Sequence, residues 1–285
     1  MLPEIRRAAH IGFCMGVRRA VDTVIQVTQQ YGGVETLGAL VHNQQVLSKL
    51  TGYGVRIIED SAEIQGDTVV ISAHGVGPQV TAELELRGLN VIDTTCAFVK
   101  RAQLAARRLS KAGFFTVVYG DGMHPEVKGI LGWADGKGIA TLDVAALRNM
   151  PDLSRKLGLL SQTTQIPGAF TAFVKEVLDI ALIKDAEVHI IDTLCHDIRR
   201  RQADTLEMAK RSDVVFVIGG RNSANTKHLF ELCAIEADIH QIEIAADINP
   251  DWLYGKKNIG VTAGASTDDA TIDEVMARLR AITNK

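Results

Sequence analysis

The sequence lacks any long apolar run and any strong excess of charge. No stretch reaches the roughly 18 apolar residues that a membrane-spanning helix needs, so we expect no membrane partner. The net charge of −3 provides no global basic field, which argues against nucleic acid as a partner. The segment before the first cysteine has no continuous apolar core. We therefore expect no signal peptide and a cytoplasmic location.

Cysteine is also scarce, with four residues in a chain of 285. In a cytoplasmic protein of this length, so few cysteines do not indicate a disulfide framework. They are either buried apolar side chains or ligands. The chain has neither a G-x-x-x-x-G-K-[ST] loop nor a convincing G-x-G-x-x-G motif, so a nucleotide is not indicated. No linker rich in Pro, Gly or Ser separates domains.

Three of the four cysteines share a repeated context. Cys14, Cys96 and Cys195 are each followed by a long helical pattern. A basic residue stands four places after each cysteine, Arg five places after it and Gly twenty-four places after it: Arg18, Lys100 and Arg199; Arg19, Arg101 and Arg200; Gly38, Gly120 and Gly219. Agreement at several offsets predicts three similar units, which we divide at 1–88, 89–187 and 188–285.

Each unit alternates strand-like and helical segments, which predicts an α/β fold of three similar lobes with parallel sheets. In open α/β sheets, ligands bind outside the carboxyl ends of the strands. Every copy places its cysteine and its polar loops at such strand ends. Three units around a pseudo-threefold axis would bring the three cysteines to one central point.

The three repeated cysteines suggest a metal centre. Soft thiolates favour zinc or an iron–sulfur cluster. Three protein ligands with one open position are typical of a catalytic site. The alternative is that all three are buried apolar residues, which are common in such proteins. Cys233 lies outside the repeat, in Lys-His-Leu-Phe-Glu-Leu-Cys, and is expected to be a core residue of a helix.

The polar loops predict an anion pocket, best suited to a phosphate or diphosphate. Imidazole, hydroxyl and amide groups lie there among small residues: His42, His74, His124, Ser223, Asn225 and Ser266. The alternative is that several are only helix N-caps, with Glu126 a favourable acid in a first helical turn. Pro125 attaches Glu126 rigidly to its loop, which makes this carboxylate the leading candidate for a proton donor.

At these residues the chain resembles the family of 4-hydroxy-3-methylbut-2-enyl diphosphate reductases of the non-mevalonate isoprenoid pathway. The matching motifs occur in the family's order from residue 12 to residue 266: Gly-Phe-Cys-Met-Gly-Val, Val-His-Asn, Ser-Ala-His-Gly-Val, Asp-Thr-Thr-Cys, His-Pro-Glu-Val, Gln-Thr-Thr, Asn-Ser-Ala-Asn and Thr-Ala-Gly-Ala-Ser. As a set they are specific, and they span nearly the whole chain.

The resemblance implies a trefoil of three α/β lobes around one [4Fe–4S] cluster held by Cys14, Cys96 and Cys195. It implies that the six residues of the anion pocket hold the substrate's diphosphate, and that Glu126 and Thr163 handle protons at the allylic hydroxyl. The implied reaction removes that hydroxyl with two electrons and two protons, and yields isopentenyl and dimethylallyl diphosphates. Ferredoxin or flavodoxin is the implied electron donor.

Three positions differ from the family's usual residues: Ala97 replaces Pro, Ile198 replaces Thr and Ala224 replaces Ser. The last two motivate an alternative, a reductase of the same fold acting on a different phosphorylated or hydroxylated compound. Two further alternatives are a non-catalytic cluster-binding sensor, which would not need Glu126 or the histidines, and a zinc hydrolase with three thiolates.

Overall fold

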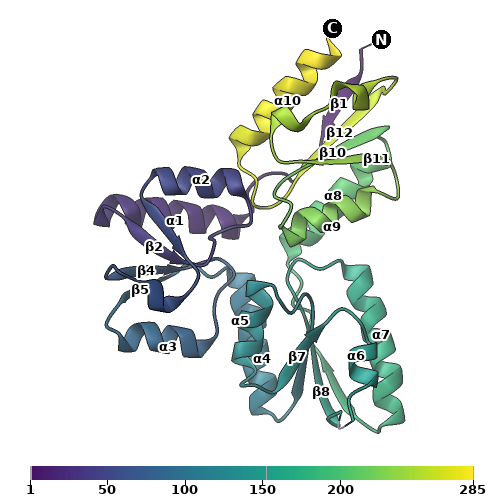
Figure 1. The fold of residues 1–285 in the computed structure, drawn as a ribbon. Helices are drawn as coiled ribbons and strands as arrows, with labels where there is room; N and C mark the ends of the chain where they lie inside the picture. The colour runs from purple at the N-terminus through teal and green to yellow at the C-terminus, as the bar shows by residue number, and fades with distance from the viewer. Residues whose placement is uncertain (1, 152, 285) are drawn as a thin grey trace. The chain divides into compact units, whose positions relative to one another are not determined.

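The structure, a computed structural model, describes residues 2–151 and 153–284. This part of the chain forms three four-stranded sheets with helices packed on them (Figure 1). All strand pairings in the three sheets are parallel. The predicted α/β class with three parallel lobes is therefore confirmed.

The order of elements follows the repeat seen in the sequence. The strands are β1 (Glu4–Arg7), β2 (Val34–Leu37), β3 (Val55–Ile58), β4 (Thr68–Ile71), β5 (Asn90–Asp93), β6 (Phe115–Tyr119), β7 (Gly138–Thr141), β8 (Lys156–Ser161), β9 (Glu187–Ile190), β10 (Val214–Ile218), β11 (Asp238–Ile242) and β12 (Asn258–Ala263). The helices are α1 (Met15–Tyr31), α2 (Gln44–Gly52), α3 (Pro78–Leu86), α4 (Ala97–Lys111), α5 (Pro125–Trp133), α6 (Ala145–Arg148), α7 (Pro167–Ile183), α8 (His196–Ala209), α9 (Ala224–Cys233) and α10 (Asp269–Thr283). Short 3₁₀ turns η1 (Ser61–Glu63), η2 (Ala245–Asp247) and η3 (Pro250–Leu253) lie between them. Among the described residues, no helix combines the length and apolarity needed to cross a bilayer.

The three sheets have the same strand order, β3-β2-β4-β5, β7-β6-β8-β9 and β11-β10-β12-β1. In each, the last strand leads to the next cysteine. Strand β5, which a division at residue 88 assigns to the second lobe, pairs with β4, and β1 pairs with β12. Sheet membership therefore differs from the expected divisions 1–88, 89–187 and 188–285. The spacing predicts a strand before each cysteine, but only the backbone hydrogen bonds show which strand it pairs with.

Contacts divide the chain into two compact units, which we describe separately. The first unit comprises Met1–Val21, Val41–Tyr53 and His196–Lys285, and contains the sheet β11-β10-β12-β1. The second unit comprises Asp22–Leu40 and Gly54–Cys195, and contains the other two sheets.

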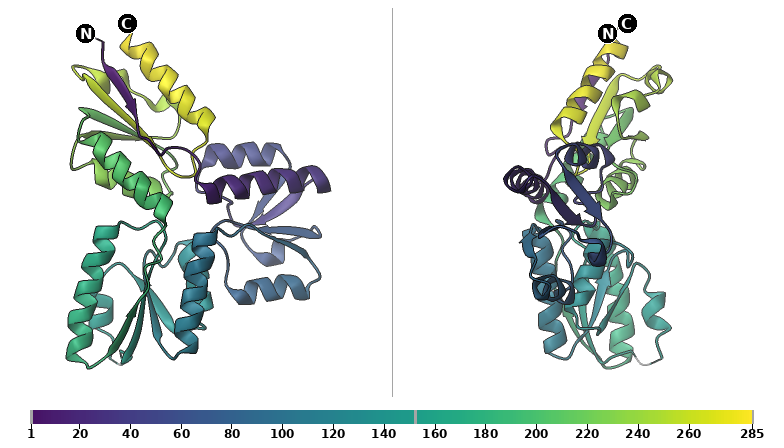
Figure 2. Two further views of the ribbon diagram at one scale, coloured as in Figure 1. Left: turned by 180° about the vertical axis from the view of Figure 1, so that it is seen from behind. Right: turned by 60° about the vertical axis from the view of Figure 1, so that its left-hand side comes forward.

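The sheet β7-β6-β8-β9 of the second unit is covered on both faces (Figure 2). Successive side chains of a strand point to opposite faces, so the adjacent residues Val117 and Val118 enter different cores. Val117 packs with Phe173 and Val177 of α7, whereas Val118 packs with residues of α4 and α5 such as Ile130. A parallel strand buried on both faces explains why β6 is apolar except at the buried Thr116.

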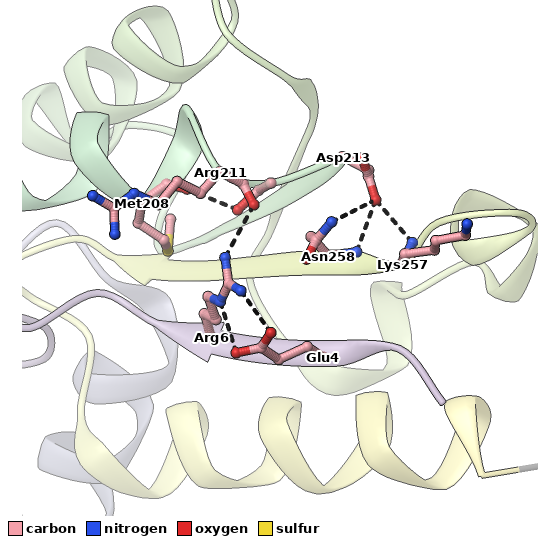
Figure 3. Close-up of polar contacts among 8 residues, drawn as sticks. Glu4, Arg6, Met208, Arg211, Asp213, Lys257 and Asn258 are labelled. Carbon is pink, nitrogen blue, oxygen red and sulfur yellow. Dashed lines mark hydrogen bonds and ion pairs between the residues drawn. The ribbon is translucent and has the colours of Figure 1, made fainter. Parts of the chain in front are cut away.

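Polar contacts fix the amino end of the sheet in the first unit (Figure 3). The Asp213 carboxylate accepts hydrogen bonds from the backbone N–H groups of Lys257 and Asn258, at 2.8 Å each, and so aligns the starts of β10 and β12. Arg6 pairs with Glu4 on β1 and donates to the Arg211 carbonyl. The opposite, carboxyl ends of the strands carry the polar loops.

Candidate functional site

The residues expected to form a site lie just beyond the carboxyl ends of parallel strands. Six of these residues each follow a different strand: His42 follows β2, His74 β4, His124 β6, Thr163 β8, Ser223 β10 and Ser266 β12. This placement agrees with the expected position of ligands in α/β sheets. His42, Ser223, Asn225, Ser266 and Cys14 belong to the first unit, and His74, His124, Glu126, Thr163, Cys96 and Cys195 to the second.

In the first unit, Cys14 lies immediately before helix α1. Its backbone N–H donates to the Ala265 carbonyl at 3.1 Å, which ties the cysteine loop to the loop after β12. Its Sγ accepts the backbone N–H of Val17 at 3.4 Å. The sulfur thus lies at the amino end of α1, where the helix dipole favours a negatively charged group.

A buried arginine that the sequence analysis did not single out supports this loop. Arg201 of α8 is 4% exposed and donates to the Gly12 carbonyl at 2.7 Å, while its Nε pairs with Asp197 at 3.0 Å. Gly12 has φ +84°, and a Cβ there would lie 2.8 Å from the Asp269 carboxylate. The signal available in the sequence was an arginine four residues after an aspartate on one helix. Arg201 therefore holds the turn that presents Cys14.

His42 approaches the loop that follows β10. A Cβ at Gly220 would lie 2.4 Å from the His42 carbonyl oxygen, so only glycine permits this approach. The Ser266 hydroxyl lies 3.5 Å from the same carbonyl. Burial lowers the pKa of His42 and favours its neutral ring. Asn43, the next residue, caps helix α2 by accepting the N–H groups of Gln45 and Val46.

The amino end of α9 contains both a cap and an unsatisfied group. Ser223 is the N-cap and its hydroxyl accepts the Thr226 N–H at 3.3 Å, as the capping alternative expected. Asn225 is 5% exposed, and neither polar atom of its amide has a hydrogen-bond partner among the described residues. A buried amide left unpaired costs about 1–3 kcal/mol. Its position at a helix amino end suits an anion that would satisfy it.

In the second unit, Cys96 and Cys195 are held by neighbouring loops. The Cys96 N–H donates to the Ala73 carbonyl at 3.0 Å, and the Cys195 N–H donates to the Thr163 carbonyl at 2.9 Å. Cys96 is the N-cap of α4, but its side chain accepts no capping hydrogen bond. Each thiol therefore precedes a helix and sits beside a strand-end loop that carries a predicted site residue.

Of the arginines five places after the cysteines, Arg101 has a defined role in the second unit. Its guanidinium donates to the Leu194 carbonyl at 3.1 Å, adjacent to Cys195. Helix α4 thus begins at one cysteine and binds the loop of another. Arg19 and Arg200 are exposed.

His74 and His124 lie together, with ring centroids 5.4 Å apart in an edge-to-face arrangement. His124 is the N-cap of α5, and its Nδ1 accepts the Glu126 N–H at 3.2 Å. In the neutral ring the proton then lies on Nε2, which makes that atom a donor suited to an anionic oxygen. Gly75 has φ +68° and permits the close approach of Gln103 and Thr95 beside His74.

Glu126 and Thr163 form a buried pair. Glu126 is 2% exposed, and its two carboxylate oxygens accept the Thr163 N–H at 2.7 Å and the Thr163 hydroxyl at 2.9 Å. Burial raises the pKa of Glu126 to about 7, against the lowering effect of the hydrogen bonds from Thr163. A carboxyl group with a pKa near neutrality can both hold and release a proton under physiological conditions.

A second residue missed by the sequence analysis is Gln162. It is fully buried beside Thr163, and its Oε1 accepts from the Asp121 N–H and the Gln165 amide. Its Nε2 has no hydrogen-bond partner among the described residues. The only signal was its place in the Gln-Thr-Thr motif at a strand end.

Cys233 differs from the other cysteines, as expected. It is fully buried in α9, in an apolar cluster with Val215, Val217 and Leu229. Burial raises the pKa of its thiol to about 12, which disfavours a thiolate. The prediction that Cys233 is a core residue of a helix is confirmed.

Each unit thus carries a cysteine thiol at a helix amino end and polar side chains at strand ends, and the second unit adds a buried carboxyl group with a pKa near neutrality. Thiols in such positions suit soft metals, and polar groups of this kind suit an anion. The family model of the LytB protein matches residues 5–280. A 4-hydroxy-3-methylbut-2-enyl diphosphate reductase of Dehalococcoides mccartyi is 60% identical over 97% of both chains. The chain belongs to the LytB family of oxidoreductases.

Two solved structures extend this similarity. A structure of (E)-4-hydroxy-3-methyl-but-2-enyl diphosphate reductase, described as the terminal enzyme of the non-mevalonate pathway, is 35% identical with a TM-score of 0.72, and the match covers 98% of this chain and 100% of that one. The E-1-hydroxy-2-methyl-but-2-enyl-4-diphosphate reductase of Plasmodium falciparum has a TM-score of 0.90, with 100% of this chain and 89% of that chain covered. At 23% identity, this second structure supports the fold alone.

Proposed function

We propose that this protein catalyses the reductive dehydroxylation of 4-hydroxy-3-methylbut-2-enyl diphosphate to isopentenyl and dimethylallyl diphosphates. The observation that carries the proposal is the buried Glu126–Thr163 pair, attached to the loop of Cys195 through the Thr163 carbonyl. This arrangement couples a proton source to a cysteine that we propose as a cluster ligand. The names of the relatives support the substrate and the pathway.

Cys14, Cys96 and Cys195 would hold one [4Fe–4S] cluster. The donor set fits this group because three thiols, each at a helix amino end, provide soft anionic ligands and leave one iron open. When bound, the cluster would supply electrons and Lewis acidity at the substrate's hydroxyl. Arg201 and Arg101 would keep the cysteine loops in place through their hydrogen bonds to backbone carbonyls.

The diphosphate would be held by His42, His74, His124, Ser223, Asn225 and Ser266. The Asn225 amide, which has no hydrogen-bond partner among the described residues, is a donor that a diphosphate oxygen would satisfy. The imidazole of His124, whose Nδ1 serves the cap, would provide a further donor through Nε2. Binding at the diphosphate end positions the allylic hydroxyl for proton transfer, which converts a bimolecular encounter into an oriented one.

Glu126 would deliver a proton to the departing hydroxyl, with Thr163 as a relay. The Thr163 hydroxyl can both accept a proton from Glu126 and donate one to the substrate oxygen. The balanced reaction consumes two electrons and two protons and releases water. We further propose that ferredoxin or flavodoxin provides the electrons, and that the protein works in the cytoplasm, where its four free cysteines would stay reduced.

The test uses anaerobically prepared protein with dithionite and methyl viologen as reductant and the proposed diphosphate as substrate. We expect about four iron and four sulfide per chain and conversion to both products. Zinc in place of iron, or a cluster-loaded protein that does not consume the diphosphate, would contradict the proposal.

A second candidate is a reductase of the same fold with another phosphorylated or hydroxylated substrate. Two observations favour it: Ala224 brings a methyl group to the first turn of α9 beside Asn225, and Ile198 is buried in the first turn of α8. A panel of allylic alcohols and diphosphates under the same conditions distinguishes the two candidates.

A further inference from the structure

The surface of helix α4 differs from that of the other helices that follow a repeated cysteine. Its 15 residues contain five basic side chains and no acidic one. Helix α1 contains Asp22, and α8 contains three acidic residues among its basic ones. In a chain with a net charge of −3, this is a local concentration of positive charge.

The basic residues lie on one side of α4. Positions 100, 104, 107 or 108, and 111 recur with the helical period and therefore form a stripe. They line a shallow groove, and we define the α4 face as Lys100, Arg101, Leu104, Arg107, Arg108 and Lys111.

The charge of this face is largely uncompensated within the second unit. Lys100 pairs with Asp93 at 2.7 Å. In the described part of the chain, Arg107, Arg108 and Lys111 are exposed and form no ion pair, although Arg107 stacks on the Trp133 ring at 5.5 Å. Arg101 donates to two backbone carbonyls and lies over the Phe98 ring at 5.4 Å.

An apolar side chain lies among these charges. Leu104 is 50% exposed, and Trp133 borders the adjoining groove beside it. Protein interfaces commonly combine a small apolar centre with a charged rim. The helix is about 22 Å long, which suits a small and transient interface.

The position of α4 connects this face to the proposed redox site. Cys96 is its N-cap, and Arg101 binds the carbonyl next to Cys195. A protein docked on the α4 face would therefore sit beside the loops of two of the three proposed cluster ligands.

We infer that the α4 face is the docking site of an acidic electron-carrier protein, an inference that rests on the proposed reductive function. Each turnover takes two electrons and two protons, reduces one carbon–oxygen bond and releases water. A carrier that gives one electron per encounter must dock twice and leave twice. Electrostatic steering suits such an exchange because it accelerates association without requiring a tight complex.

The test compares protein-driven with chemically driven reduction. The variant carries Arg107→Glu, Arg108→Glu and Lys111→Glu, and the control carries the same charge change on the first unit, at exposed Lys257, Arg278 and Arg280. The probe is an acidic [4Fe–4S] ferredoxin kept reduced by NADPH and a ferredoxin reductase. A second variant carries Arg107→Gln, Arg108→Gln and Lys111→Gln, which remove the positive charge without reversing it. It serves if the charge-reversed protein fails to fold.

We expect the charge-reversed protein to raise the KM for ferredoxin on the order of ten- to a hundredfold at low salt. Its rate with dithionite and methyl viologen should equal that of the wild type, and the Gln variant should show an intermediate KM. The wild-type rate with ferredoxin should fall as ionic strength rises, whereas that of the charge-reversed protein should not.

Equal KM values and equal salt dependence for wild type and variant would overturn the inference, as would an equal loss in the control. Loss of binding to an RNA or DNA oligonucleotide, with ferredoxin kinetics unchanged, would assign the face to a different partner. Calorimetric titration of ferredoxin at low salt needs no turnover. A protein inactive with dithionite would refute the proposed function, while the titration would still decide the docking site.

Discussion

A buried pair in the second unit and a buried amide in the first differ in how their polar groups are satisfied. In the second unit, Glu126 and Thr163 satisfy each other with two short hydrogen bonds. In the first, the Asn225 amide is equally buried but has no partner among the described residues. The first arrangement is complete without a ligand and sets the pKa of a carboxyl group. The second has an energetic cost that an anionic ligand would remove.

Under the proposed function, the proton-handling pair lies in the second unit, whereas the proposed anion donors come from both units, with Asn225 in the first and His74 and His124 in the second. The proposed cluster ligands are also divided, because Cys14 lies in one unit and Cys96 and Cys195 in the other.

The largest effect is expected from the cysteines. If one cluster takes ligands from both units, Cys14→Ser should remove the brown absorption and the bound iron as completely as Cys96→Ser or Cys195→Ser. Cys233→Ala is the control, and it should retain the cluster because its thiol lies in an apolar core. Iron analysis and the visible spectrum provide the measurement. A normal cluster in Cys14→Ser would confine the metal site to the second unit.

Glu126→Gln should reduce turnover by about 10²–10⁴ while cluster content and diphosphate affinity stay near those of the wild type. The amide keeps hydrogen-bonding capacity but cannot release a proton. Glu35→Gln is the matched control, a buried glutamate paired with Arg56 on β3, and it should lower the melting temperature with nearly full activity. If Glu126→Gln behaved like the control, Thr163 or a bound water would become the candidate acid.

The same carboxyl group predicts a pH dependence of stability. Its folded-state pKa of about 7 exceeds the ordinary glutamate value of 4.5, so between these pH values the folded protein keeps a proton that the unfolded chain has released. The free energy of unfolding should then fall as pH rises through this window, by up to about 3 kcal/mol, and change no further above it. Urea unfolding of wild type and Glu126→Gln from pH 4.5 to 8 isolates this contribution, which the variant should lack.

Asn225→Ala should weaken diphosphate binding by roughly 10- to 150-fold, the worth of a hydrogen bond to a charged group. Because the amide is unpaired in the free protein, the variant should be as stable as the wild type or slightly more stable. Asn249→Ala is the contrasting control, since Asn249 caps η3 and its loss should cost about 1 kcal/mol without affecting binding. Calorimetric titration and thermal melts separate the two effects. A destabilised Asn225→Ala protein with unchanged affinity would show that the amide has a structural role.

The smallest effect is expected from Ala224→Ser, which adds a hydroxyl donor at the amino end of α9. We expect diphosphate affinity to rise on the order of tenfold, the lower end of the range for a hydrogen bond to a charged group, because the hydroxyl at this half-buried position would also bind water in the free protein. A gain with another substrate but not with this diphosphate would favour the alternative reductase. The KM for each substrate is the readout.

Many of the candidate site residues could be predicted because they are Cys, His and Glu residues at strand ends, and these residue types are recognised directly in the sequence. The cysteines, the histidines and Glu126 were found from their repeated spacing and from the motif set. Arg201 and Gln162 were missed because their significance depends on segments distant in the sequence. Arg201 matters because it donates to the Gly12 carbonyl, and Gln162 because its buried amide nitrogen has no hydrogen-bond partner among the described residues. Local spacing indicates neither feature.

The capping alternative illustrates the same limit. Ser223 and His124 are N-caps in the structure, and we propose that both also bind the diphosphate. Sequence could only weigh the two roles against each other. In the structure His124 uses Nδ1 for the cap, so in the neutral ring its proton lies on Nε2, and the two roles are compatible.

Periodicity and spacing along the chain are enough to predict the threefold repeat, the parallel α/β lobes and the residues placed at strand ends. The folded protein alone reveals that β1 is the edge strand beside β12, that β5 is the edge strand beside β4, and that Glu126 is buried together with Thr163. These features depend on backbone pairing and desolvation between segments far apart in sequence, and no local pattern encodes them.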